Sequence, residues 1–187
     1  MKASREKNQI DSTLKPEELA RQAYAKAIKL LSNREHSSTE LRNKLNDSGF
    51  STDTIETTLE KLIGMGYQSD ERFANLYAES LLRKNYGPML MSAKLNARGI
   101  ESSQAQEAIQ AAIQERGVDW STVASDALLS KFSTTQFSGK LHQDSSQDST
   151  GLDQVFMGKC ARFLNRRGFS FTDSITAIRL ASETVSE

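Results

Sequence analysis

Apolar residues recur along this chain at the three- and four-residue spacing of an α-helix, and glycines interrupt the pattern at intervals. One such stripe consists of Ile55, Leu59, Leu62 and Ile63, and it ends at Gly64. Spacing of this kind predicts an amphipathic helix that buries one face against the rest of the protein. No stretch shows the convincing alternation of apolar and polar residues that marks a half-buried strand. The pattern therefore predicts an all-α protein.

The same reasoning predicts nine helices along the chain. They are expected at about residues 16–32, 38–49, 52–66, 70–87, 88–99, 102–117, 119–132 and 156–168, followed by a last helix that holds Ile175 and Ile178. Other residues expected on inward faces are Leu41, Leu45, Phe73, Leu76, Tyr77, Leu81, Ile109, Ala112, Ile113, Phe156, Cys160, Phe163 and Leu164.

Two helix starts carry capping patterns. Ser37 and Glu40 have the spacing of a capping box, in which a serine side chain accepts a hydrogen bond from the backbone three residues later. Phe50 and Ile55 flank Ser51 at the spacing of a hydrophobic staple around a serine N-cap. Helices are therefore predicted to begin directly after Ser37 and after Ser51.

Glycines and serines mark other expected helix boundaries. Gly49 is predicted to be a left-handed C-terminal cap, because glycine adopts positive φ without steric cost. Gly87 and Gly117 are expected to end two later helices, and Ser102 or Ser103 is expected to cap the helix that ends at Gly117.

A short motif, Leu-Asn-x-x-Gly-apolar, occurs three times, at residues 45–50, 95–100 and 164–169. The first two copies are 50 positions apart and the second and third are 69 apart. The longer interval contains a polar stretch of 19 residues, Ser133–Gly151, and without it the two intervals are equal. One unit of about 50 residues therefore occurs three times, which is typical of a repeat protein.

We therefore predict three tandem three-helix repeats that form an elongated array. The expected parts are a flexible N-terminal arm at 1–15 and repeats at 16–66, 67–117 and 118–187, the last with an insertion at 133–151. The insertion is rich in Ser, Gln, Asp and Thr and nearly free of large apolar groups. Such a composition cannot bury enough surface to offset chain entropy, so a mobile surface loop is expected there.

Composition limits the classes of function. The chain has 24 basic and 24 acidic residues, so it lacks the strongly basic character of proteins held to nucleic acid by electrostatics alone. Its single cysteine, Cys160, cannot form an intrachain disulfide, as is typical of a reducing compartment. No apolar run approaches the length of a membrane span. A cytoplasmic protein is expected.

Few residues suggest catalysis. The chain has no phosphate-binding Gly-x-x-x-x-Gly-Lys-Ser/Thr loop and no His-Glu-x-x-His zinc motif. Its two histidines and one cysteine are too far apart in sequence to suggest a tetrahedral metal site, and no cofactor is expected. His36 is expected to face solvent or to cap a helix. Cys160 is expected in the core, although nearby cations also allow a reactive thiol.

Basic residues near the repeated turns are the better candidates for a binding site. The cations that precede the turn glycines are expected to complement the negative ends of their helices. They also suggest a charged stripe along one edge of the array, extended by two cations exactly one repeat apart. The residues proposed to bind a partner are Arg34, Lys84, Arg98, Arg162, Arg166 and Arg167. The motif residues Asn46, Asn96 and Asn165 are expected to form local hydrogen bonds near their turns.

Three segments, in order, resemble the signatures of a known family. Residues 31–37, followed by Glu40-Leu41 and Lys44-Leu45, are similar to the Arg-Glu-His-Ser signature of the RecX family. Residues 70–74, with Gly87 and Arg98-Gly99-Ile100, resemble the family's second unit, and residues 162–169 resemble its C-terminal signature. The resemblance covers roughly residues 23–180.

This resemblance implies a bacterial cytoplasmic protein, built from tandem three-helix units, that regulates the RecA recombinase in recombination, DNA repair and the SOS response. It implies binding in the groove of the RecA–DNA filament, with inhibition of ATP hydrolysis, strand exchange and coprotease activity. No catalysis, cofactor or membrane contact is implied. We expect a monomer that makes at most a weak contact with DNA.

Two other classes of function remain open from the residues. A DNA-binding protein of helix-turn-helix type is the main alternative, because each three-helix unit has a suitable size. Overall neutrality and three similar units favour the filament regulator, whereas a steep salt dependence of binding to naked DNA would favour the alternative. The third class is an enzyme with an unrecognised site.

Overall fold

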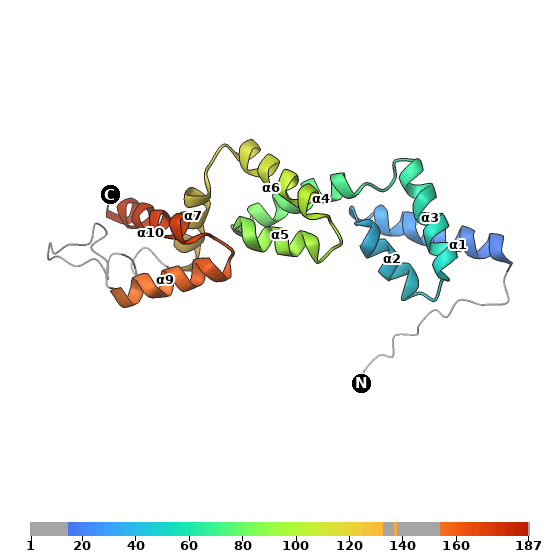
Figure 1. Ribbon diagram of the computed structural model, residues 1–187, viewed down its shortest axis with the longest axis horizontal. Helices are drawn as coiled ribbons and strands as arrows, with labels where there is room; N and C mark the ends of the chain where they lie inside the picture. The colour runs from blue at the N-terminus through green and yellow to red at the C-terminus, as the bar shows by residue number, and fades with distance from the viewer. Residues whose placement is uncertain (1–14, 133–136, 138–153, 187) are drawn as a thin grey trace, which may run out of the picture. The chain divides into compact units, whose positions relative to one another are not determined.

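The computed structural model describes residues 15–132, 137 and 154–186, and all the helices in these residues are α-helices (Figure 1). The helices are α1 (Pro16–Leu31), α2 (Ser38–Asn46), α3 (Thr52–Gly64), α4 (Asp70–Leu82), α5 (Pro88–Asn96), α6 (Ser102–Arg116), α7 (Trp120–Lys131), α9 (Gln154–Arg166) and α10 (Phe171–Ser186). The described residues contain no strand. The prediction of an all-α protein with three helices per repeat is therefore confirmed.

The chain divides into two compact units. Unit 1 extends through Ala74 and also includes Arg98–Ile100, whereas unit 2 comprises Asn75–Ala97 and the chain from Glu101 onward. In unit 1, α1 and α2 both pack against α3 (Figure 1). The core that they share consists of Ala23, Ala27, Leu41, Leu45, Phe50, Ile55, Leu59 and Leu62.

In unit 2, α5 packs against α6, and α10 packs against both α7 and α9. A cluster of phenylalanines joins the end of α7 to α9. The ring of Phe132 meets those of Phe156 and Phe163 edge to face, with centroids 5.4 and 5.8 Å apart. Such aromatic pairs stabilise a core beyond the area that they bury.

The same cluster corrects the prediction for the polar insertion. Phe137 lies inside the segment expected to be a mobile surface loop, yet its side chain is fully buried. Its ring centroid lies 5.1 Å from that of Phe156 and 6.4 Å from that of Phe132. This residue of the predicted loop therefore belongs to the core. The rest of the predicted insertion, and the predicted N-terminal arm up to residue 14, lie outside the described residues.

The three repeated turns have the same backbone conformation. Gly49, Gly99 and Gly168 have φ angles of 92°, 81° and 87°, in the left-handed region that favours glycine. Each lies between the second and third helices of its repeat. Their equivalence, which the sequence register predicted, is confirmed.

Two predicted boundaries were wrong. Ser102 and Ser103 do not cap α6, because its N-cap is Glu101 and no side chain supplies the capping hydrogen bond. Gly87 does not end α4, which stops at Leu82. The positive φ of 53° belongs to Asn85, and Gly87 is instead the N-cap of α5 with a φ of −80°.

Three apolar residues predicted to face inward are exposed. The side chains of Ile63, Leu76 and Ile175 retain 51%, 47% and 41% of their accessible surface. Each lies at the edge of an apolar stripe whose centre is filled by neighbours, as Leu62 is beside Ile63. A helical residue turns about 100° from the one before it, so the outer member of such a stripe faces solvent.

Candidate interaction site

The cations proposed as contacts fall into two groups. Arg34 and Arg98 belong to unit 1, and Lys84, Arg162, Arg166 and Arg167 belong to unit 2. Some of these side chains contact the fold itself, and others project from it. That distinction decides which of them are available to a partner.

In unit 1, both arginines bind the carboxylate of Glu40 in the first turn of α2. Arg34 Nη1 lies 2.8 Å from Glu40 Oε2, and Arg98 Nε lies 3.3 Å from Glu40 Oε1. His36 Nδ1 also lies 2.9 Å from Glu40 Oε2. Glu40 is therefore the centre of a small charged network. Sequence reasoning assigned Glu40 only to a capping box, because no local signal reveals a partner as distant in sequence as Arg98.

His36 differs from its prediction, because its side chain is buried rather than facing solvent. Burial lowers the pKa of His36, and the hydrogen bond with Glu40 opposes that shift without cancelling it. Burial raises the pKa of Glu40, but hydrogen bonds with Arg34 and His36 outweigh it, so the pKa of Glu40 lies below its ordinary value. The network thus favours a neutral histidine beside an ionised carboxylate.

Ser37 ties this network to the second repeated turn. Its hydroxyl accepts a hydrogen bond from Glu40 N at 3.1 Å, as the capping-box spacing predicted. The same hydroxyl donates to the carbonyl of Arg98 at 2.7 Å. A Cβ on the neighbouring Gly99 would overlap the side chain of Thr39. The start of α2 therefore fits closely against this glycine turn.

An equivalent junction lies inside unit 2. Gly87 N donates to the carbonyl of Arg167 at 2.8 Å, and Met89 N donates to the carbonyl of Gly168 at 3.1 Å. A Cβ on Gly87 would overlap the Gly168 carbonyl. The start of α5 therefore meets the third repeated turn backbone to backbone, which only glycine permits at this position.

Arg167 completes that junction with its side chain. Its guanidinium donates from Nη1 to the carbonyls of Lys84 and Asn85, the second at 3.1 Å. The same group lies 5.1 Å from the ring centroids of Tyr86 and Phe163, within the range of cation–π contacts. Arg167 was proposed as a partner contact, but its guanidinium is engaged within the fold and joins two repeats. Lys84 is exposed and contributes its carbonyl.

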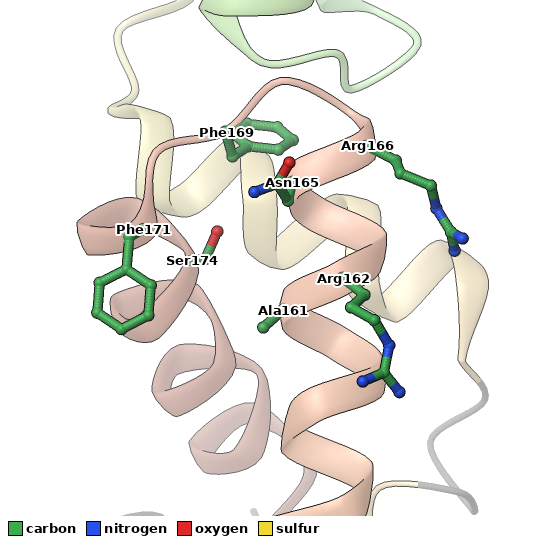
Figure 2. Close-up of a pocket in the computed structure, with 7 residues that line it drawn as sticks. All are labelled: Ala161, Arg162, Asn165, Arg166, Phe169, Phe171 and Ser174. Carbon is green, nitrogen blue, oxygen red and sulfur yellow. The ribbon is translucent and has the colours of Figure 1, made fainter.

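Arg162 and Arg166 differ from Arg167, because both are exposed on α9. They are four residues apart and so lie on one face of the helix, and Figure 2 shows both side chains extending from that face. The inward face of α9 is occupied by Phe156, Cys160 and Leu164, all buried. Within the described residues, neither guanidinium has an ion pair or hydrogen bond. These two arginines are available to a partner.

A groove of about 350 Å³ lies between α9 and α10 beside these arginines (Figure 2). It is lined by Ala161, Arg162, Asn165, Arg166, Phe169, Phe171 and Ser174. Phe171, at the start of α10, keeps 77% of its side-chain surface exposed. Sequence reasoning missed Phe171. Its position four residues before Ile175, outside the buried stripe that contains Ser174 and Ile178, is the signal that could have identified it.

Cys160 is a core residue, as expected. Its side chain is fully buried, and burial raises the pKa of its thiol to about 12. The thiolate needed by a nucleophile is therefore disfavoured at neutral pH.

The described residues also contain no group of three His, Cys, Asp or Glu side chains placed to hold a metal ion.

Among the motif asparagines, Asn96 forms the expected local hydrogen bond, from Nδ2 to Ser102 Oγ at 3.3 Å. No helix in the described part of the chain is both long enough and apolar enough to cross a bilayer.

Comparisons with known proteins place this geometry in a family. The model of the first three-helix domain of RecX matches residues 23–62, and that of the second matches residues 69–109. Regulatory protein RecX of Chromohalobacter salexigens is 35% identical over 145 residues, which cover 78% of this chain and 83% of that protein. The chain belongs to the RecX family.

Other RecX proteins support the same assignment. Regulatory protein RecX of Legionella pneumophila is 31% identical over 147 residues, covering 79% of this chain and 86% of that protein. The crystal structure of RecX from Lactobacillus salivarius is 20% identical, covers 89% of this chain and 99% of that one, and has a TM-score of 0.67. A second RecX crystal structure has a TM-score of 0.66 at 19% identity. These structures share the fold.

Proposed function

We propose that this protein is a non-enzymatic regulator that binds the RecA–DNA filament. It inhibits ATP hydrolysis, strand exchange and the coprotease function of the recombinase. It acts as a cytoplasmic monomer whose binding modules are the repeats at residues 16–66, 67–117 and 118–187. Its membership in a family of regulatory proteins supports this proposal.

The observation that carries the proposal is the exposed pair of Arg162 and Arg166 on α9. The apolar face of this helix is already buried, so the arginines present a charged edge to a partner. A guanidinium binds carboxylates and phosphates through a planar fork of donors. A nucleoprotein filament offers both groups. Arg34 and Arg98 add a second basic edge in unit 1, partly neutralised by Glu40.

The test is inhibition of DNA-dependent ATP hydrolysis by RecA. The double variant Arg162→Ala/Arg166→Ala is expected to require at least tenfold more protein for half-inhibition, equivalent to about 1.4 kcal/mol. Arg167 is left intact, because its contacts with Lys84 and Asn85 hold the fold. The matched control is Arg83→Ala/Arg179→Ala, which removes two exposed arginines of unit 2 that are paired with Glu79 and Glu183.

The control is expected to inhibit as well as the parent protein. Unchanged inhibition by a folded Arg162→Ala/Arg166→Ala variant would remove this pair from the binding site. No inhibition by the parent protein at any concentration would contradict the proposed function as a whole.

Binding to double-stranded DNA in the manner of a helix-turn-helix protein is the second candidate. The observation that favours it is the arrangement of α9, the Gly168 turn and α10, in which two helices are joined by a short turn beside exposed arginines. This candidate predicts tight binding to a naked duplex with a steep loss of affinity as salt increases. The regulator predicts tight binding to a duplex only when RecA is present.

A further inference from the structure

We infer that the groove between α9 and α10 binds single-stranded DNA, with a base stacked on Phe171 and the adjacent phosphates held by Arg162 and Arg166. The exposed aromatic ring of the groove favours a single strand over a duplex. The choice of DNA over RNA rests on the proposed function, because a recombinase filament contains DNA.

The charges of the groove select an anionic ligand. Its lining contains two arginines and no acidic residue. Two other grooves of unit 2 differ in this respect: one combines Glu79 and Glu115 with arginines, and the other contains Glu107 without any cation. Asp173, in the first turn of α10, does not line the groove, and its carboxylate accepts a hydrogen bond from Ser170 Oγ at 2.6 Å. An anion in the groove would therefore meet guanidinium groups first.

Phe171 indicates that the anion carries a base that can stack. Phe171 has the largest exposed fraction among the exposed large hydrophobic side chains of the described residues. A phenyl ring at the rim of a basic groove offers a face on which a base can stack. Proteins that bind single strands combine such aromatic platforms with basic residues along the backbone. A base inside a duplex is already stacked on both sides and cannot use the ring.

The remaining lining suits a planar ligand. Ala161 and Ser174, which line the groove on α9 and α10, have small side chains (Figure 2). Asn165 is exposed on the same surface and carries both a donor and an acceptor for a base edge. A volume of about 350 Å³ lies at the lower end of the range of ligand pockets. The groove therefore accommodates about one nucleotide unit, with the rest of the strand outside.

The experiment measures binding of a fluorescently labelled oligo(dT) to the full protein without RecA, by fluorescence anisotropy. Phe171→Ala and Phe171→Leu are both expected to weaken binding about tenfold, and Phe171→Tyr is expected to retain it. The leucine variant is decisive, because it keeps an apolar side chain but loses the stacking face. Phe171 is exposed, so the thermal unfolding midpoints are expected to stay unchanged.

The arginines are tested through salt dependence. Each phosphate contact on a single strand contributes about 0.7 to the slope of log affinity against log salt. Arg162→Ala/Arg166→Ala is therefore expected to reduce that slope by about 1.4, whereas Arg83→Ala/Arg179→Ala leaves it unchanged. A duplex of the same length is expected to bind more weakly than oligo(dT) and to be insensitive to Phe171.

Several results would overturn the inference. These are no binding of oligo(dT) by the parent protein at low salt, parent-like binding by Phe171→Leu, and equal competition by a polyglutamate peptide. Binding of oligo(rU) at least as tight as that of oligo(dT) would overturn the choice of DNA. None of these binding measurements contains RecA. A lack of oligo(dT) binding is therefore distinct from a failure to inhibit ATP hydrolysis by RecA.

Discussion

At the scale of single residues, the arginine before the turn glycine distinguishes one repeat from another. Arg98 and Arg167 occupy this position in the second and third copies of the motif, and the first copy has Ser48. The carbonyls of both arginines accept a hydrogen bond from the N-cap residue of an earlier helix, Ser37 or Gly87. These N-caps are themselves 50 positions apart. The motif therefore forms a junction between consecutive repeats at its second and third copies.

Arg167 and its neighbour Arg166 form a matched pair for testing that junction. We predict that Arg167→Ala lowers the free energy of unfolding by about 1.5–3 kcal/mol, because hydrogen bonds from a charged donor and two aromatic contacts are lost. Arg166→Ala should change it by less than about 0.5 kcal/mol, as is usual for an exposed side chain. Urea denaturation of the two variants measures the difference. Equal stabilities would show that the Arg167 contacts contribute nothing.

At the scale of helices, local patterns predicted most starts and stops. The caps at Ser37 and Ser51 depend on residues within three positions, so the sequence alone reveals them. The second hydrogen bond of Ser37, to the carbonyl of Arg98, spans 61 positions and has no local signature. The role of Gly87 as a helix end was predicted wrongly for the same reason. Position 87 requires glycine because the backbone of Gly168, far along the chain, approaches it closely, and not because of the φ angle of Gly87.

The candidate site was predictable only in part. Exposed Arg162 and Arg166 follow from the helical spacing of the buried residues on α9. The sequence did not separate them from Arg167, because adjacent residues of a helix end can face either a partner or the fold. Nor did composition reveal Phe137, since one phenylalanine among polar residues hardly changes the average character of a segment.

Phe137 provides a test of the phenylalanine cluster in the third repeat. We predict that Phe137→Ala lowers the free energy of unfolding by about 3–5 kcal/mol, because it leaves a cavity beside Phe132 and Phe156. The matched control is Phe171→Ala, which removes an exposed ring and should cost less than about 0.5 kcal/mol. Thermal unfolding followed by circular dichroism compares the two. A Phe137→Ala variant as stable as the control would show that this ring is not part of the core.

At the scale of the whole molecule, we expect acid to act on unit 1 through its buried histidine. The buried His36 contacts Glu40, which also pairs with the exposed Arg34, and all three residues lie in unit 1. The other histidine of the chain, His142, lies outside the described residues. Burial holds the pKa of His36 below its ordinary value of 6.5, with Arg34 and Lys44 adding to the shift and Glu40 opposing it. The folded protein therefore binds a proton at His36 less readily than the unfolded chain does.

The sign of the pH dependence follows from this difference. When the unfolded state binds more protons, stability falls as the pH decreases. The contribution of His36 is complete above pH 6.5 and is lost progressively below it, at no more than about 1.4 kcal/mol per pH unit for one proton. The contribution of Glu40, whose pKa lies below 4.5, is lost at lower pH still. Unit 1 is therefore expected to lose stability in two stages on acidification.

Amide hydrogen exchange at pH 7.0 and 5.5 can resolve this effect unit by unit. We predict that protection in α1–α3 falls by up to about tenfold over this range. His36→Asn keeps a side-chain donor near Glu40 but cannot take up a proton, so it should abolish this fall. His142→Gln is the matched control and should leave the fall in α1–α3 unchanged. If His36→Asn retains the full pH dependence, acid acts on unit 1 through groups other than this buried histidine.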